Sequence, residues 1–151
     1  MFIHTPNTKP LPNLKRKNED GRRVYYDDDG VKYHSVTNVV GSIDQQGLEE
    51  WRKAVGEDVA NYVSRKAMNL GTKMHTMVET YLYNKKNSEK NLFAKAHFDN
   101  IKPLLQPITN IRGLEEKMCS KELGLAGTAD CIAQYNGELS IIDFKTSSKK
   151  K

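Results

Sequence analysis

The stretch of sequence that decides the fold is GTADCIAQYNGELSIIDFKT, residues 127–146. Its two halves are short and rich in β-branched and aromatic residues, and the dipeptide Asn136-Gly137 separates them. Asn-Gly between two such runs favours a two-residue type I′ turn, whose twist matches that of paired antiparallel strands. The sequence therefore predicts a β-hairpin with strands over 127–135 and 138–146.

The register of this hairpin brings two carboxylates together. With the dipeptide as the loop, Asp130 lies directly opposite Asp143, and Thr128 lies opposite Lys145. Opposed side chains on one sheet face have Cβ atoms about 4.5–5.5 Å apart, and like charges at that distance destabilise a sheet. A divalent cation would offset this repulsion. Because side chains alternate along a strand, Lys145 projects from the same face as Asp143.

Two aspartates with an adjacent lysine suit the hydrolysis of a phosphodiester. Carboxylate oxygens bind Mg²⁺ or Mn²⁺, which keep positions free for water and phosphate oxygens. The metal lowers the pKa of a bound water and stabilises charge on the phosphate, while the lysine orients the water or offsets negative charge. The competing interpretation is that Asp130 flanks a turn and that Asp143 and Lys145 form a solvated strand end.

Helical periodicity marks the middle of the chain. The longest periodic stretch runs from about Val59 to Tyr83, a shorter helix is expected over 48–55, and another begins near Ser88. Pro103 distorts or ends that last helix. Two short strands are expected around the acidic turn Asp27–Gly30. Helices followed by strands indicate an α+β, or mixed α/β, domain in which helices cover a central sheet.

The length and composition fit one globular domain. The 151 residues are 37% hydrophobic and 28% charged, which excludes collagen-like, low-complexity and disulfide-stapled chains. The net charge of +5 is uneven, because residues 1–23 have six Lys/Arg against two acidic residues, whereas residues 24–144 have 14 basic and 17 acidic side chains. The N-terminal prolines predict a flexible basic arm over 1–22, followed by a single domain over 23–151.

The cysteines and the hydropathy pattern favour a cytoplasmic protein without a membrane partner. Cys119 and Cys131 are too few for a disulfide framework and lack zinc-site spacing. No apolar run approaches the roughly 18–20 residues of a membrane helix. Prolines stand where a signal peptide would have its apolar core.

The hairpin segment resembles the core motif of the PD-(D/E)XK nuclease superfamily, in its RecB-like exonuclease branch, which includes phage and mitochondrial genome-maintenance exonucleases. The family pattern is G-x-x-D, a strand and turn, and then (I/V)-(I/V)-D-(F/Y/W)-K-T, matched here by Gly127, Asp130 and Ile141–Thr146. The resemblance implies a restriction-endonuclease-like core, with helices flanking a central mixed sheet. It also implies a DNA exonuclease that uses Mg²⁺ or Mn²⁺ on single-stranded DNA or duplex ends. Phage DNA replication, recombination or repair in an infected bacterial cell is the implied setting.

The same resemblance assigns roles to individual residues. Asp130 and Asp143 would bind the metal, the backbone carbonyl of Phe144 would add a ligand, and Lys145 would be catalytic. The segment Asn69–Leu82 is similar to the family's G-T-x-x-H helix, so that His75 becomes a metal or phosphate ligand. Glu115, preferred over Glu116, is a further implied metal ligand, and Glu79 is an implied partner of His75. Gly71 is implied as a point of close helix packing. The implied DNA contacts are Ser35, Thr37, Thr72 and Thr146. For Glu79, Ser35 and Thr37, ordinary surface or strand positions fit the sequence equally well.

The sequence also departs from the family pattern. Beyond the D-x-K strand the family has a helix with a Q-x-x-x-Y motif, whereas this sequence ends at Lys151. The expectation is a C-terminally truncated fragment, a protein partner that supplies the missing segment, or a chain without full activity. Iron–sulfur variants use four cysteines, so no cluster is expected. Two alternatives to an exonuclease are a non-catalytic DNA-binding module and an unrelated α+β protein. An unrelated protein would not explain why these motifs occur together.

Overall fold

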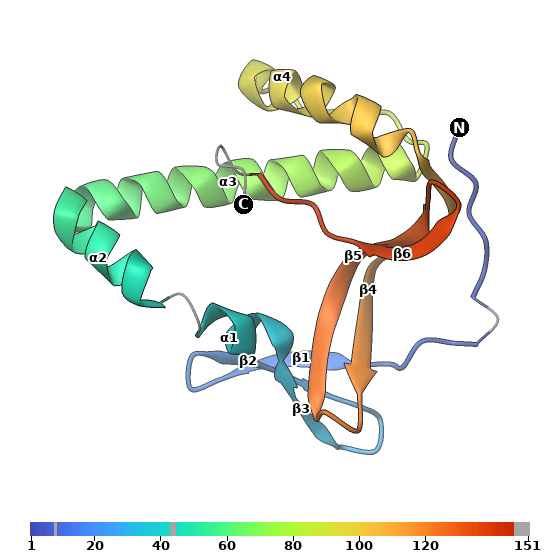
Figure 1. Cartoon of the computed structure of the whole chain (residues 1–151), viewed down its shortest axis with the longest axis horizontal. Helices are drawn as coiled ribbons and strands as arrows, with labels where there is room; N and C mark the ends of the chain where they lie inside the picture. The colour runs from blue at the N-terminus through green and yellow to red at the C-terminus, as the bar shows by residue number, and fades with distance from the viewer. Residues whose placement is uncertain (8, 43–44, 147–151) are drawn as a thin grey trace.

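The computed structural model describes residues 1–7, 9–42 and 45–146. Within these residues the fold is mixed α+β, with four α-helices beside one curled six-stranded sheet (Figure 1). The predicted α+β class with a mixed sheet is therefore confirmed. In chain order the elements are β1 (Lys15–Glu19), β2 (Arg22–Tyr26), β3 (Lys32–Ser35), α1 (Val36–Gly41), α2 (Gln45–Val55), α3 (Glu57–Leu82), α4 (Leu92–Ile101), a 3₁₀ turn (Lys102–Leu105), β4 (Ile108–Ser120), β5 (Leu125–Tyr135) and β6 (Glu138–Ile142).

Two long strands, β4 and β5, organise the sheet. The strand order is β1-β2-β3-β5-β4, and β6 pairs with the far part of β5. The pairing of β3 with β5 is parallel, through Ser35 and Ala126, and the other pairings are antiparallel. The two long strands run from the level of α3 down to the β1–β2 hairpin (Figure 1). One sheet thus has two separate packing regions.

The predicted C-terminal hairpin is confirmed, but its second strand is shorter than expected. Tyr135 pairs with Glu138, and the ladder continues to the pair Cys131 and Ile142. The turn residues have positive φ, 51° at Asn136 and 87° at Gly137, as a type I′ turn requires. Because β6 ends at Ile142, the expected pairing of Asp130 with Asp143 lies one step beyond the ladder and is not formed.

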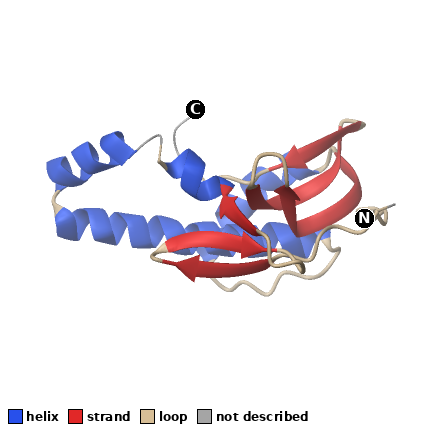
Figure 2. Cartoon of the chain, turned by 90° about the horizontal axis from the view of Figure 1, so that it is seen from below, coloured by secondary structure: helices blue, strands red, loops and turns tan. Residues whose placement is uncertain are grey.

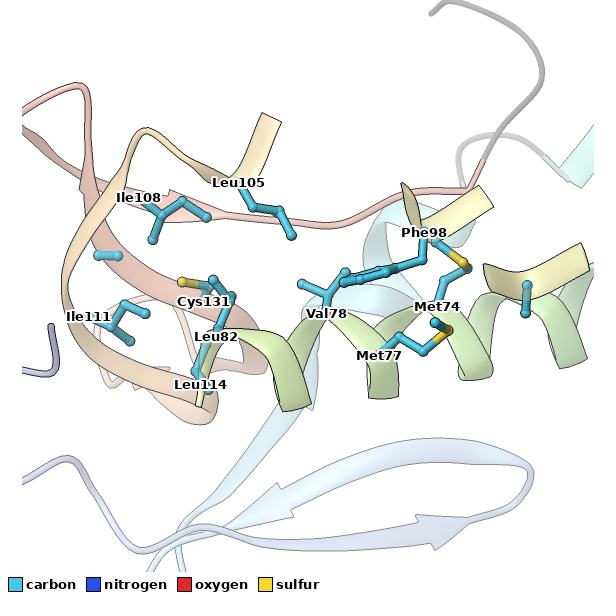
Figure 3. Packing of buried hydrophobic residues seen from close by; sticks show 12 residues of the cluster. Met74, Met77, Val78, Leu82, Phe98, Leu105, Ile108, Ile111, Leu114 and Cys131 are labelled. Atoms are coloured by element: carbon cyan, nitrogen blue, oxygen red, sulfur yellow. The ribbon is translucent and has the colours of Figure 1, made fainter. Parts of the chain in front are cut away.

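The long helix is also confirmed, and it packs against the upper part of the sheet. A cluster of buried residues joins α3 to α4 and to the upper halves of β4 and β5 (Figure 3). Leu82 and Val78 are 0% and 1% exposed, and Phe98 of α4 covers the same helix. The cluster comprises Met74, Met77, Val78, Leu82, Ala94, Phe98, Leu105, Ile108, Ile111, Leu114, Cys131 and Ala133. The periodic apolar side chains that predicted α3 therefore hold the C-terminal half of this helix against the sheet and α4.

The N-terminal half of α3 has little cover. Between Glu57 and Asn69 only Ala60 is buried, and α2 has no buried residue. Figure 2 shows α2 and the start of α3 extending past the strands. The helix is therefore anchored at one end and projects from the sheet at the other. None of the helices in the described part of the chain combines the length and the hydropathy of a membrane-spanning segment.

The expected unpacked arm over 1–22 is wrong. Residues 15–19 form β1, which pairs with β2, and Leu14 is only 2% exposed in a second cluster with Tyr25, Tyr33 and Ala126. Phe2 packs against the upper cluster. The folded unit therefore includes residues before 23, because their apolar side chains are needed to close both regions of the sheet.

Two local expectations differ from the structure in smaller ways. The β-branched run after Ser35 forms the short helix α1 instead of continuing a strand. The helix expected from Ser88 begins at Leu92, because the Asn91 side chain accepts a hydrogen bond from the backbone N–H of Ala94 and caps it. Pro103 stands in the 3₁₀ turn that ends this helix, as expected.

Candidate metal centre

Three side chains from three elements converge beside the sheet. His75 comes from α3, Glu115 from β4 and Asp130 from β5, and each offers a ligand atom within 4.8 Å of the other two. The buried neighbours of His75 on α3, Met74 and Met77, anchor the helix in the core and leave the imidazole at its edge. The sequence-based expectation that His75 and Asp130 belong to one site agrees with this geometry.

Glu115 and Asp130 are brought together by the register of β4 and β5. Leu114 pairs with Cys131 and Glu116 pairs with Ala129, so that Glu115 and Asp130 are the positions between these pairs. Glu115 has φ of 53°, in the left-handed region, which costs about 1–2 kcal/mol for a residue with a side chain. A strained acidic residue at this point of a strand is typical of a functional site.

The imidazole of His75 is held in one orientation. Its Nε2–H donates to the backbone carbonyl of Phe144 at 2.7 Å. A neutral ring that donates from Nε2 has a bare lone pair on Nδ1. That Nδ1 lies 3.8 Å from Oε1 of Glu115 and 3.7 Å from Oδ2 of Asp130. A nitrogen lone pair and two carboxylates that face one another repel, because all three groups are electron-rich. A cation or a proton between them would remove this repulsion.

The segment after β6 locks this arrangement. The backbone N–H of Phe144 donates to Oδ2 of Asp130 at 2.8 Å, while the carbonyl of the same residue accepts from His75. One peptide segment therefore orients two of the three candidate ligands. The Phe144 carbonyl, expected as a metal ligand, accepts a hydrogen bond from the imidazole in this structure, and its role as a ligand stays a prediction.

Asp143 and Lys145 lie outside the three-residue group. Their side chains are 57% and 75% exposed, and Lys145 Nζ binds Asp143 Oδ1 at 3.0 Å. Both line an apolar groove of about 750 Å³, whose other wall includes Thr37 and Val36 of α1. The structure therefore places the D-x-K pair at the mouth of a groove rather than opposite Asp130.

The expected DNA-contacting hydroxyls fall into different environments. Thr37 is exposed at the groove, and Thr146 is exposed with its Oγ1 3.5 Å from where a Cβ on Gly71 would stand. Thr72 is exposed and donates to the carbonyl of Met68 in its own helix. Ser35 is 0% exposed, so its expected contact with DNA is wrong for this structure, because the side chain lies inside the fold.

Burial and the neighbouring charges of the site both act on Glu115. Partial burial, and then the charge of Asp130, raise the pKa of Glu115 above its usual 4.5, while His75 opposes the shift. A raised pKa means that the folded state favours the protonated carboxyl. Ionised Glu115 therefore costs stability at neutral pH, and a bound cation would remove that cost.

Glu115→Gln is expected to stabilise the metal-free protein at pH 7 by an amount below about 1 kcal/mol, since the side chain is partly exposed. The difference should vanish as the pH falls below 4.5, where the carboxyl is protonated in both the folded and unfolded states. Urea unfolding at pH 7 and pH 4, with Glu122→Gln in an exposed turn as the control, measures this. Equal stabilities of wild type and Glu115→Gln at pH 7 would contradict the repulsion.

The fold and the site together define a mixed α+β protein with an imidazole–carboxylate centre on its sheet. No family model matches the sequence. The sequence is similar to mitochondrial genome maintenance exonuclease 1, with 29% identity over 111 residues to the human protein and 31% over 115 residues to the mouse protein. The protein of that name from Xenopus tropicalis is 27% identical over 112 residues. Each match covers 69% of this chain and 32% of the relative, so the chain matches about a third of these proteins.

Proposed function

We propose that this chain carries the metal-binding core of a DNA exonuclease of the PD-(D/E)XK class, with a restriction-endonuclease-like arrangement of sheet and helices. The observation that carries the proposal is the convergence of His75, Glu115 and Asp130 beside the segment that bears the D-x-K motif. The similarity to proteins named exonucleases supports the same activity. A setting in phage replication or recombination rests on the motif resemblance alone.

The donor set fits a divalent cation. His75 Nδ1 and the carboxylates of Glu115 and Asp130 would hold the ion, and one imidazole with two carboxylates suits Mn²⁺ or Mg²⁺, with Mn²⁺ favoured by the nitrogen ligand. When bound, the ion lowers the pKa of a coordinated water and offsets charge on a phosphate. Phe144 contributes by holding both His75 and Asp130 through its backbone.

Lys145 and Asp143 are proposed to act from the mouth of the groove. The ammonium of Lys145 is exposed and long enough to contact a phosphate oxygen or the attacking water. Asp143 orients that ammonium through their 3.0 Å contact, and by the motif resemblance it would add a carboxylate to the metal. Thr37, on the opposite wall, offers a hydroxyl to the DNA backbone.

The test is a divalent-metal assay on labelled single-stranded and duplex DNA. Mn²⁺ and Mg²⁺ are expected to support shortening of the DNA from an end, and EDTA is expected to abolish it. A second candidate function, a non-catalytic or partner-dependent DNA-binding module, is favoured by the position of Asp143 and Lys145 outside the metal group. Metal-independent DNA binding with no hydrolysis in either metal would support that second function and overturn the first.

A further inference from the structure

The β1–β2 hairpin has a dense group of positive charges. Five cations occur within nine residues, and the structure folds them onto two paired strands. We call this group the basic ribbon, and it consists of Lys15, Arg16, Lys17, Arg22 and Arg23. By contrast, residues 24–144 have more acidic than basic side chains. The ribbon is therefore a local positive region on an otherwise slightly acidic body.

These charges are not held in ion pairs by the surrounding described residues. Among the described residues, no ion pair includes any member of the basic ribbon. The nearest strand carboxylate, Glu19, is bound at 2.6 Å to Lys32 and also accepts a hydrogen bond from Tyr26. Within the described residues the ribbon therefore has no direct ion-pair partner, and the charge of Glu19 acts on Lys17 only from a longer distance.

The strand register sorts the ribbon into two faces. Lys15 and Lys17 share one face by the alternation of side chains, and Arg22 joins them because it pairs with Glu19. Lys17 Nζ lies 5.0 Å from the centre of the Tyr26 ring, which holds the ammonium over the sheet. Lys15 and Lys17 stand about 7 Å apart along the strand, which spans about two phosphates of a nucleic-acid strand.

The ribbon belongs to the same half of the sheet as the groove. β1 is an edge strand of the sheet, and β3 leads directly into α1 (Figure 1). Residues of α1 line the groove together with Lys145. A nucleic-acid strand seated at the groove would leave it toward this half of the molecule. There the nucleic-acid strand would meet the β1–β2 hairpin. Among the described residues, this is the only pair of strands with five basic side chains that are in no ion pair.

We propose that the basic ribbon binds the phosphodiester backbone of the DNA and holds it beside the groove. This inference rests on the proposed function. Lysines on an edge strand also prevent strands of different molecules from pairing. That role predicts aggregation when the charges are removed, whereas backbone binding predicts a change in the salt dependence of DNA binding.

The decisive variant is Lys15→Gln/Lys17→Gln/Arg22→Gln, which removes three exposed charges from one face. Binding to a labelled oligonucleotide is measured in EDTA, so that hydrolysis does not interfere, over a range of salt concentrations. Each phosphate contact contributes about 0.7 to 0.9 to the slope of log K against log salt. The variant is expected to lose about two units of slope and about tenfold or more of affinity at low salt.

The matched control is Lys86→Gln/Lys90→Gln/Lys95→Gln, which removes the same charge from exposed positions, two in the segment between α3 and α4 and one on α4. The charge-keeping variant Lys15→Arg/Lys17→Arg/Arg22→Lys should retain the wild-type slope. Circular dichroism confirms that each variant is folded. If wild type binds and the decisive variant matches the control, the ribbon inference is overturned and the proposed function stands. If wild type neither binds nor hydrolyses DNA, both are overturned.

Discussion

Asp130→Asn is expected to lower metal-dependent hydrolysis of DNA by about 10²-fold or more, with little effect on folding. Asp130 accepts a hydrogen bond from the backbone N–H of Phe144 in the D-x-K segment, and the same Oδ2 lies 3.7 Å from Nδ1 of His75. A metal ion supplies several kcal/mol of transition-state stabilisation, and each 1.4 kcal/mol corresponds to about tenfold in rate. Asparagine keeps an oxygen that accepts from the Phe144 N–H, so the loss isolates the charge.

The assay compares initial rates at saturating Mn²⁺ with the apparent metal affinity from a Mn²⁺ titration. Asp99→Asn on the exposed face of α4 is the matched control, because it makes the same chemical change away from the site. Asp130→Asn should raise the Mn²⁺ concentration needed for half-maximal rate, and Asp99→Asn should not. Full activity of Asp130→Asn at low Mn²⁺ would remove Asp130 from the proposed metal centre.

Leu82→Ala is expected to destabilise the protein by about 3 kcal/mol. Leu82 is 0% exposed at the end of α3, within the upper cluster, and leucine-to-alanine changes in such positions cost about 2–5 kcal/mol. Its backbone carbonyl also accepts a hydrogen bond from the ring of His4, which ties the N-terminus to the helix end. The change removes apolar contact from the half of α3 that positions His75.

Urea unfolding followed by circular dichroism measures this loss. Leu92→Ala is the control, because Leu92 is 79% exposed and its truncation should change the stability by less than about 0.5 kcal/mol. A Leu82→Ala protein as stable as wild type would show that the helix end is not held by the upper cluster. The two variants share residue chemistry and differ in burial, so their contrast measures packing alone.

The sequence predicts elements that depend on local chemistry. The turn Asn136-Gly137 was predicted because its residue types alone favour the positive φ values that the structure has. The periodic stretch from about Val59 to Tyr83 predicts the long helix, which spans Glu57–Leu82 in the structure, because its apolar spacing is continuous. The candidate ligands His75 and Asp130 followed from motif resemblance, and the structure brings them together.

The rest depended on tertiary contacts. Residues 15–19, KRKNE, have no apolar alternation, and they form a strand because they pair with β2. The signal that could have found this hairpin was Asp20-Gly21, which has the same turn chemistry and positive φ values of 49° and 74°. Nothing local indicated that β6 would end at Ile142, so the position of Asp143 outside the metal group could not be predicted.

The division of the sheet into two packing regions determines which part of the fold fixes each side of the candidate metal centre. Ala126 of β5 belongs to the lower cluster, and Cys131 of the same strand belongs to the upper one. Asp130 stands next to the joint between them. Its position relative to His75 is fixed by the upper half, and its position relative to the groove wall is fixed by the lower half. The placement of the candidate metal centre relative to the groove therefore depends on the short part of β5 between Ala126 and Cys131, which joins the two packing regions.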